Sequence, residues 1–190
     1  MKLIKEISDT DSRRLSKIRS ASRAVLFDEN NKIPLLFVSK YSYHKLPGGG
    51  LGKNEDKIMG LVREVKEETG CDIKIYDEVG RIIEFRYKYD LKQTSYCYIG
   101  KIIKKGKQSF TKKELREGFK LVWVTIDEAI SLLKNDNTKN YEGSFIIKRD
   151  LEFLKEAIKF VGTTYTAKKD YLLQKKDICK NVRATTSLQH

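Results

Sequence analysis

Three glutamates, Glu64, Glu67 and Glu68, lie within one stretch whose apolar residues recur every three or four positions. On a helix, offsets of three and four place side chains on one face, one above the other. Like charges at that spacing repel each other, so such a helix needs a partner of opposite charge. A bound cation reverses the sign of the interaction, and ligation by oxygen alone suits hard ions such as Mg²⁺. The stretch therefore predicts a helix with one face for packing and one for a metal ion.

The predicted helix runs from about Glu55 to Thr69, with Asn54 as its N-cap and Gly70 as its C-terminal stop. Its apolar residues follow helical spacing and are expected to point away from the glutamates. They are Ile58, Leu61, Val62 and Val65. Upstream, the glycines of Pro47–Gly50 permit a close approach of the backbone to a ligand. The sequence thus predicts a glycine loop that leads into an acidic helix.

Runs with strand character lie on both sides of this helix. Ala24–Phe27 and Ile33–Val38 flank a turn signal and are expected to pair as a hairpin. The further strands expected are Ile73–Tyr76, Val79–Tyr89, Thr94–Ile103 and Phe119–Val124. The further helices expected are Thr125–Lys134, which opens with a capping box to Glu128, and Ser144–Phe160. This mixture indicates an α/β fold, classed as α+β in some schemes.

The chain has 190 residues and a formal net charge of +13. This length suits one well-cored domain, which we place at residues 20–160. Both flanking segments are basic, namely an N-terminal lead-in or edge element at 1–20 and a C-terminal extension at 161–190. Basic segments attract polyanions, so nucleic acid binding stays open beside the simpler interpretation of a lysine-rich surface.

Three cysteines, Cys71, Cys97 and Cys179, lie far apart in the sequence. Their spacing fits neither a disulfide framework nor a metal site, and a cytoplasmic location in a reducing environment is the simplest inference. The sequence shows no signal peptide and no apolar run near the length of about 18 residues that a membrane span requires. Secretion and membrane insertion are therefore not expected.

The stretch from Gly49 to Cys71 resembles the Nudix box, in which a glycine, an acid, an Arg-Glu pair, a Glu-Glu pair and a second glycine stand at fixed spacing. The matching residues are Gly49, Glu55, Arg63, Glu64, Val65, Glu67, Glu68 and Gly70. Cys71 departs from the pattern, because an aliphatic residue is usual there, but a buried cysteine behaves as a small hydrophobe. The resemblance covers residues 20–160 and implies an α/β/α sandwich around a mixed β-sheet.

The same resemblance implies an enzyme that hydrolyses phosphoric anhydride bonds, cleaving a nucleoside diphosphate linked to another group. Glu64, Glu67 and Glu68 would hold the metal, with the carbonyl of Gly48 as a further ligand. Mg²⁺ is the expected ion, and Mn²⁺ is the alternative. A divalent cation suits the reaction because hydrolysis of a pyrophosphate builds negative charge on the phosphoryl oxygens and the leaving group.

The proton of the attacking water would pass to a glutamate of the box or to an acid from a distant loop. Glu117 is the candidate loop acid, and Glu114 is the second choice. Arg63 and Glu55 are expected to pair and to orient the glutamate helix. The residues assigned to catalysis are Glu64, Glu67, Arg63 and Glu117. Structural support of the site is assigned to Glu55, Gly49 and Gly70.

The residues before the glycine loop are candidates for contacting the substrate. Lys40 and Lys45, with His44, are expected near phosphates, and Tyr43, with Tyr41, near a base. Sequence markers of members that cleave ADP-ribose, such as a proline shortly after the box, are absent. By elimination, the expected substrate is a nucleoside triphosphate, including an oxidised or non-standard one, cleaved to monophosphate and pyrophosphate. Two alternatives stay open, an enzyme that acts on an RNA 5′ end or cap and a non-catalytic nucleotide sensor, and so does a homodimer.

Overall fold

The computed structural model describes residues 1–9 and 13–160. The chain divides into two compact units, Met1–Ala157 and Ile158–His190, and the description below concerns the first. The basic extension predicted at 161–190 lies outside the described residues. Among the helices that are described, none is long and apolar enough to cross a membrane.

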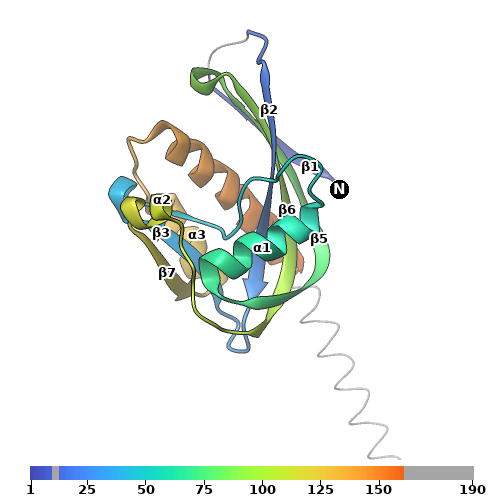
Figure 1. The fold of residues 1–190 in the computed structure, drawn as a ribbon, viewed down its shortest axis with the longest axis vertical. Coiled ribbons are helices and arrows are strands. Elements are labelled where there is room, and N and C mark those ends of the chain that lie inside the picture. Colours follow the sequence, from blue (N-terminus) through green and yellow to red (C-terminus); the bar gives the residue numbers. More distant parts are fainter. Residues whose placement is uncertain (10–12, 161–190) are drawn as a thin grey trace, which may run out of the picture. The chain divides into compact units, whose positions relative to one another are not determined.

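A four-stranded mixed sheet forms one half of the first unit, with the strand order β1-β5-β6-β2. Its strands are β1 (Leu3–Ser8), β2 (Lys17–Phe27), β5 (Asp72–Arg86) and β6 (Leu91–Lys104). The central pair β5 and β6 is antiparallel, whereas β1 runs parallel to β5 and β2 runs parallel to β6 (Figure 1). Strand β1 therefore adds the N-terminal residues to one edge of this sheet, and β2 forms the opposite edge.

A second sheet is antiparallel and has the order β4-β3-β7. Its strands are β3 (Ile33–Val38), β4 (Tyr43–Lys45) and β7 (Phe119–Val124). The predicted hairpin between Ala24–Phe27 and Ile33–Val38 is wrong, because β2 and β3 belong to different sheets. Both runs are buried on nearly every residue, so their apolar sequence carries no alternation that identifies a partner strand. Asp28 shapes the turn between them by accepting hydrogen bonds from the backbone N–H groups of Asn30 and Lys32.

Helices cover both sheets. Helix α1 (Lys57–Thr69) packs on β2 and β5, α2 (Lys112–Glu117) packs on β7, and α3 (Ile126–Asn135) packs on β3 and β4. Thr125 and Glu128 form the capping box predicted for α3. Residues 141–157 of this unit form a C-terminal helix. A mixed sheet with helices confirms the predicted fold class (Figure 1).

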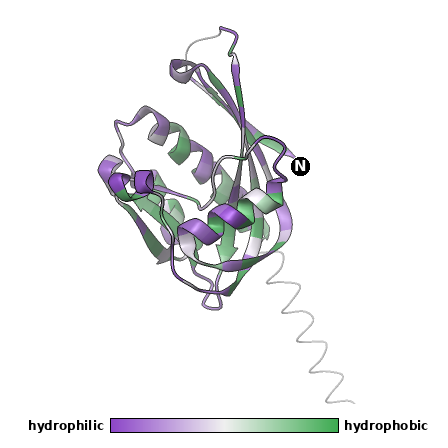
Figure 2. Cartoon of the chain, viewed as in Figure 1, coloured by the Kyte–Doolittle hydropathy of each residue, from purple (hydrophilic) through white to green (hydrophobic). Residues whose placement is uncertain are grey.

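Helix α1 is amphipathic, with hydrophilic and hydrophobic residues along its length (Figure 2). Its buried stripe runs through Leu61, Val65 and Glu68. The prediction that Ile58 and Val62 also pack is wrong, since both are about two-fifths exposed, at 43% and 40%. The buried stripe is rotated toward the glutamates, so one of the three acids lies inside the protein.

The ends of α1 differ in part from the prediction. Asp56 is the N-cap, and its carboxylate accepts hydrogen bonds from the N–H groups of Ile58 and Met59. Asn54 was predicted in this role but has a φ of 62°, in the left-handed region, whereas an N-cap residue has extended geometry. Gly70 ends the helix as predicted, with a φ of 74° that favours glycine.

Candidate active site

The three glutamates of α1 are not equivalent. Glu67 is the most exposed, with 42% of its side chain accessible, whereas Glu64 is 16% exposed and Glu68 is 1% exposed. Helical spacing places them on neighbouring positions of one face, but the loop before α1 covers the position of Glu68. The arrangement therefore gives one carboxylate access to solvent, holds a second against the loop and encloses a third.

Glu68 is fixed by two short contacts. Its Oε1 lies 2.6 Å from the Nζ of Lys45, and its Oε2 accepts a 2.6 Å hydrogen bond from the backbone N–H of Gly48. Burial raises the pKa of Glu68, and the charge of Lys45 and the Gly48 hydrogen bond oppose that rise. The structure thus joins two residues with separate predicted roles, since Lys45 was assigned to the substrate and Glu68 to the metal.

Arg63 connects the exposed carboxylates. Its guanidinium donates to both oxygens of Glu55, at 3.0 and 3.2 Å, and to Oε1 of Glu64 at 2.7 Å. Its Nη1 also lies 3.6 Å from Glu67. Glu55 in turn accepts a 2.7 Å hydrogen bond from the N–H of Gly52, and these hydrogen bonds, that from Arg63 foremost, lower its pKa. Exposed ion pairs contribute little to stability. The main consequence of the contacts of Arg63 is therefore that they fix the orientation of the Glu55 and Glu64 carboxylates.

The glycine loop runs antiparallel along the free edge of β2. Ala21 and Gly50 form an isolated bridge. Backbone hydrogen bonds of 2.9 to 3.2 Å join Ser20 to Leu51, Ser22 to Gly49 and Ala24 to Pro47. The loop is therefore held like an added strand, and its pairing with β2 fixes the position of its backbone.

Gly49 is where the loop meets the glutamate helix. A Cβ on this residue would lie 2.0 Å from Oε2 of Glu64 and 2.1 Å from its Cδ. A side chain here would displace the Glu64 carboxylate, so only glycine allows the loop and this carboxylate to approach so closely. The geometry accounts for a glycine at the first position of the motif.

The segment that carries the distant acids is tied to the same helix. The N–H of Ser109 donates to the carbonyl of Glu67 at 2.7 Å. Glu117 ends α2, a helix where the sequence predicted a loop, and its side chain is 19% exposed. Glu114 forms a capping box with Thr111, and its carboxylate accepts the hydrogen bond of the Thr111 backbone N–H. Of the two acids, Glu117 is therefore the one that is not used to cap α2.

The comparisons with known proteins agree with this site. A family model described as "NUDIX domain" matches residues 17–144, well over half of the chain. The chain belongs to the NUDIX family. Membership, with every acid of the Nudix box present, identifies it as a hydrolase of pyrophosphate bonds. Comparison with curated proteins gave no match.

Solved structures share the Nudix fold. The chain is similar to a NUDIX hydrolase from Nitrosomonas europaea, with a TM-score of 0.56 and 18% identity over 75% of this chain and 90% of that one. It is also similar to a MutT protein from Methanosarcina mazei, with a TM-score of 0.53 and 23% identity over 76% of this chain and 96% of that one. At these identities the likeness establishes the fold.

The Nudix box offers a donor set suited to a divalent cation. Nudix hydrolases generally use divalent metals, and the candidate ligands here are all oxygens, which hard ions prefer. Within residues 1–9 and 13–160, no group of three or more His, Cys, Asp or Glu side chains is gathered as a metal cage. The carboxylates instead have cationic partners, Arg63 for Glu64 and Lys45 for Glu68. The chemistry of the donors fits a metal ion, which would take over part of the charge balance that these cations supply.

The predicted substrate contacts occupy different surroundings. Tyr43 is 5% exposed and packs with Val38 and Ile146, so its ring is not available for stacking on a base. Burial also raises the pKa of Tyr43. His44 is held by Asp136, which accepts from its backbone N–H at 2.6 Å and lies 2.9 Å from its Nδ1. The side chains of Tyr43 and His44 are therefore engaged in contacts within the protein.

Lys40 and Lys45 also differ. Lys40 is exposed in a 3-10 turn (Ser39–Tyr41), with its Nζ 5.4 Å from the ring centroid of Tyr41. Lys45 is buried between Glu68 and the ring of Phe119, whose centroid lies 5.1 Å from its Nζ. Of the two lysines, only Lys40 presents its ammonium to solvent.

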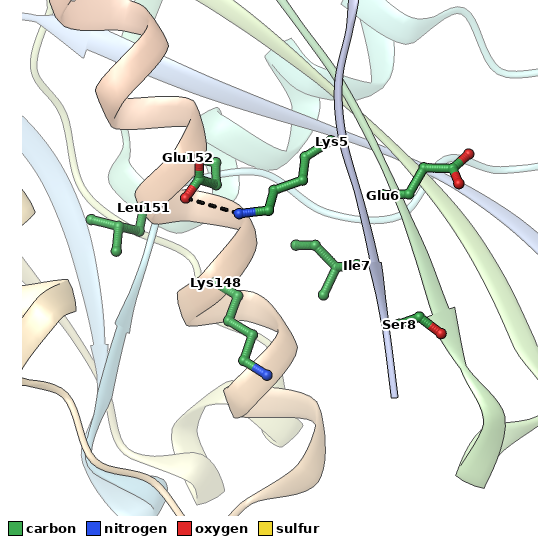
Figure 3. Close-up of a pocket in the computed structure, with 7 residues that line it drawn as sticks. All are labelled: Lys5, Glu6, Ile7, Ser8, Lys148, Leu151 and Glu152. Atoms are coloured by element: carbon green, nitrogen blue, oxygen red, sulfur yellow. Dashed lines mark ion pairs between the residues drawn. The ribbon is translucent and has the colours of Figure 1, made fainter. Parts of the chain in front are cut away.

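A cleft of about 270 Å³ lies between β1 and the C-terminal helix (Figure 3). Lys5 and Glu152 form an ion pair of 3.4 Å across it. None of the residues that line this cleft belongs to the Nudix box or to the predicted site. It is therefore separate from the candidate active site.

A buried polar cluster was not predicted from the sequence. It joins β5 and β6 to the C-terminal helix and consists of Glu84, Arg86, Gln93, Ser95, Arg149 and Asp150, none more than 1% exposed. Charged residues also stand beside Arg149 and Asp150 in the sequence, at Lys148 and Glu152, so no local signal separates the buried pair from exposed charges.

Proposed function

We propose that this Nudix hydrolase cleaves a nucleoside diphosphate linked to another group, and that its substrate is a nucleoside triphosphate, including an oxidised or non-standard one. The products would be a nucleoside monophosphate and pyrophosphate. The observation that supports this most is the complete set of box acids, three of them on α1, with Glu68 enclosed against the glycine loop. Degenerate, non-catalytic versions of this fold usually lose acids of the box, whereas every one is present here.

In this proposal the metal ligands are Glu64, Glu67, Glu68 and the carbonyl of Gly48, with Mg²⁺ as the ion and Mn²⁺ as the alternative. When bound, the ion would supply neutralisation of the phosphoryl oxygens and orientation of the attacking water. The Gly48 N–H and Lys45 keep one oxygen each of Glu68 in a fixed direction, so this ligand is preorganised. Preorganised charge costs no reorganisation during the reaction.

The proton of the attacking water passes to a carboxylate in this proposal. Glu64 lies against the glycine loop, Glu67 faces solvent, and Glu117 is a partly buried acid at the end of α2, so these three are the candidate bases. Arg63 holds Glu64 and pairs with Glu55, and its role is to aim the carboxylates. Separate Glu→Gln variants assign the base, because loss of the base lowers kcat with nucleotide affinity retained.

Substrate phosphates are assigned to the two lysines before the loop. The exposed ammonium of Lys40 is suited to direct contact, and Lys45 would reach a phosphate only by exchanging its contact with Glu68. Tyr43 is packed in a hydrophobic cluster and is assigned a supporting role behind these lysines. Variants Lys40→Ala and Lys45→Ala are expected to raise KM, with the larger loss of folding stability at Lys45.

The leading proposal is tested with Glu67→Gln and a panel of substrates. Nucleoside diphosphates and triphosphates, ADP-ribose and capped RNA are assayed for released products with Mg²⁺ or Mn²⁺. The variant should lose most turnover yet bind nucleotide, whereas Glu29→Gln, an exposed acid in the β2–β3 turn, should match the wild type. Absence of metal-dependent hydrolysis across the panel would favour the non-catalytic sensor.

A second function, hydrolysis at an RNA 5′ end or cap, is favoured by the net charge of +13 and the basic segments 1–20 and 161–190. The test is removal of residues 161–190. An RNA enzyme should lose activity on RNA and keep activity on mononucleotides. Equal activity of both forms on both substrates would contradict an RNA-binding role for the extension.

The setting of the enzyme is also a proposal. We place it in the cytoplasm, because Cys71 and Cys97 are free, buried thiols, as in a reducing environment.

A homodimer is the proposed assembly state, and light scattering coupled to size-exclusion chromatography tests it directly.

A further inference from the structure

Two adjacent residues of the C-terminal helix, Arg149 and Asp150, are fully buried although both are charged. Removing an ion pair from water is costly, and an apolar pair of similar size often serves stability as well or better. Both residues lie beyond the segment 17–144 that the NUDIX model matches. A buried charge pair in this place therefore needs a reason that packing alone does not supply.

Asp150 uses both of its carboxylate oxygens. Oδ1 accepts a 2.7 Å hydrogen bond from Nε of Arg149, and Oδ2 accepts a 2.8 Å hydrogen bond from the backbone N–H of Leu46. Leu46 connects β4 to the glycine loop. The C-terminal helix therefore reaches the loop through one carboxylate.

Glu68 holds the glycine loop two residues further along, at Gly48. Pro47 has no N–H, so the successive backbone donors of this turn are those of Leu46 and Gly48. The first donates to Asp150 and the second to Glu68, at 2.8 and 2.6 Å. Two buried carboxylates from different helices thus fix the two ends of the Leu46–Gly48 turn.

Asp150 itself has a rigid support. Arg149 extends its Nη1 to 3.4 Å from Glu84 on β5, and Glu84 also accepts a 2.7 Å hydrogen bond from Arg86. Arg86 in turn donates to Glu142 at 2.9 Å, at the start of the C-terminal helix. This chain of charges attaches the helix to the mixed sheet and restricts where Asp150 can lie.

We propose that Asp150 is a positioning residue that holds the Leu46–Gly48 turn, and through it the Glu68 carboxylate, in the geometry needed for metal binding and hydrolysis. Arg149 orients Asp150. This inference rests on the proposed function, because Glu68 is a metal ligand only within it. Asp150 contacts no candidate ligand directly and acts through the backbone of the loop.

The decisive variant is Asp150→Asn. Its single carbonyl oxygen can serve only one of the two donors, Leu46 N–H or Arg149 Nε, and its amide opposes the other. The matched control is Glu152→Gln on the same helix, where Glu152 forms exposed ion pairs with Lys5 and Lys155. The first measurement needs neither metal nor substrate and is amide hydrogen exchange of the metal-free proteins.

We expect the Gly48 amide of Asp150→Asn to exchange at least about tenfold faster than in the wild type, while the Leu61 amide in α1 is unchanged. Mn²⁺ affinity should weaken by about tenfold, as when an outer-shell partner is lost. Turnover should fall by about tenfold to a hundredfold with little change in KM, because a displacement near 1 Å is enough. Glu152→Gln should match the wild type in all three.

Uniformly faster exchange, with Mn²⁺ affinity and kcat unchanged, would show that Asp150 serves stability alone and would overturn the proposal. If Asp150→Asn does not fold, Arg149→Lys takes its place, since lysine cannot bridge Asp150 and Glu84 at once. Unchanged Gly48 exchange in that variant would equally refute it. If the wild type hydrolyses no nucleotide, the proposed function fails, but hydrogen exchange and Mn²⁺ affinity still decide the role of Asp150.

Discussion

Replacing Gly49 by alanine should separate activity from stability. The new Cβ would lie 2.0 Å from Oε2 of Glu64, so the carboxylate must retreat by about 1.4 Å to reach the 3.4 Å at which ordinary contact begins. The loop cannot retreat as easily, because its backbone is hydrogen-bonded to β2 at Gly49 itself, at 3.0 Å, and on either side of it at Pro47 and Leu51, at 3.2 and 2.9 Å. Gly49 also has no positive φ, so alanine is not strained by its backbone.

The magnitudes follow from these contacts. Loss of the exposed pair between Arg63 and Glu64 costs about 0–1 kcal/mol, and an unfavourable rotamer costs about 0.5–1.5 kcal/mol. The lower entropy of the unfolded alanine chain returns about 0.4–1 kcal/mol. The net change in unfolding free energy therefore lies between a gain of about 0.5 kcal/mol and a loss of about 2 kcal/mol, which lowers the Tm by at most about 4–8 °C for a chain of this size. Turnover should fall by about a hundredfold, because a 1 Å displacement of a catalytic group has that effect.

The assay measures pyrophosphate release under single-turnover conditions beside thermal unfolding. Gly52→Ala is the control, since a Cβ there meets Glu55 no closer than 3.5 Å. The reasoning is refuted if Gly49→Ala keeps more than a third of wild-type turnover at an unchanged Tm. An equal loss of turnover in Gly52→Ala would also refute it, because the effect would then not depend on Glu64.

Three further predictions concern charge. Lys45→Met leaves the buried Glu68 carboxylate without its cation, so urea unfolding should show a loss of about 3–5 kcal/mol, and a loss below 1 kcal/mol would contradict the burial of this pair. Burial alone would raise the pKa of Glu84, but Arg149 and Arg86 outweigh it and the pKa is lowered, so its stabilising contribution is present above pH 4.5 and is lost as the pH falls below that. The stability difference between wild type and Glu84→Gln should therefore shrink from pH 7 to pH 3.5, and a constant difference would exclude this account. Chelation of divalent ions should abolish hydrolysis and Mg²⁺ should restore it, whereas activity that persists after exhaustive chelation would exclude a metal-dependent mechanism.

The sequence identified the family because the Nudix box is a local pattern. Acids at helical spacing, a terminating Gly70 and a preceding glycine loop are read from neighbouring residues, and the NUDIX match confirms the membership. The strand Phe119–Val124 and the capping box of α3 were equally local, and both are present as predicted. Local propensity and capping chemistry suffice for features of this kind.

What the sequence did not predict depends on contacts between distant residues. The inward rotation that buries Glu68 requires Lys45 as a partner, and a separation of 23 residues leaves no periodic signal. Tyr43 looked like an aromatic residue of a loop, yet it is on β4 and packs against Ile146 of the C-terminal helix. Asp150 contacts Leu46 across 104 residues, and only the fold brings them together.

The pairing of the glycine loop with β2 has a consequence for the solution behaviour of the protein. Strand β2 is the edge of the mixed sheet, and an unprotected edge offers unpaired N–H and C=O groups on which another chain can add a strand. The loop covers this edge at Ser20, Ser22 and Ala24. Substitutions that release the loop would therefore expose a template for intermolecular association, and inactive loop variants should be recovered as soluble aggregates more often than variants on the exposed face of α1.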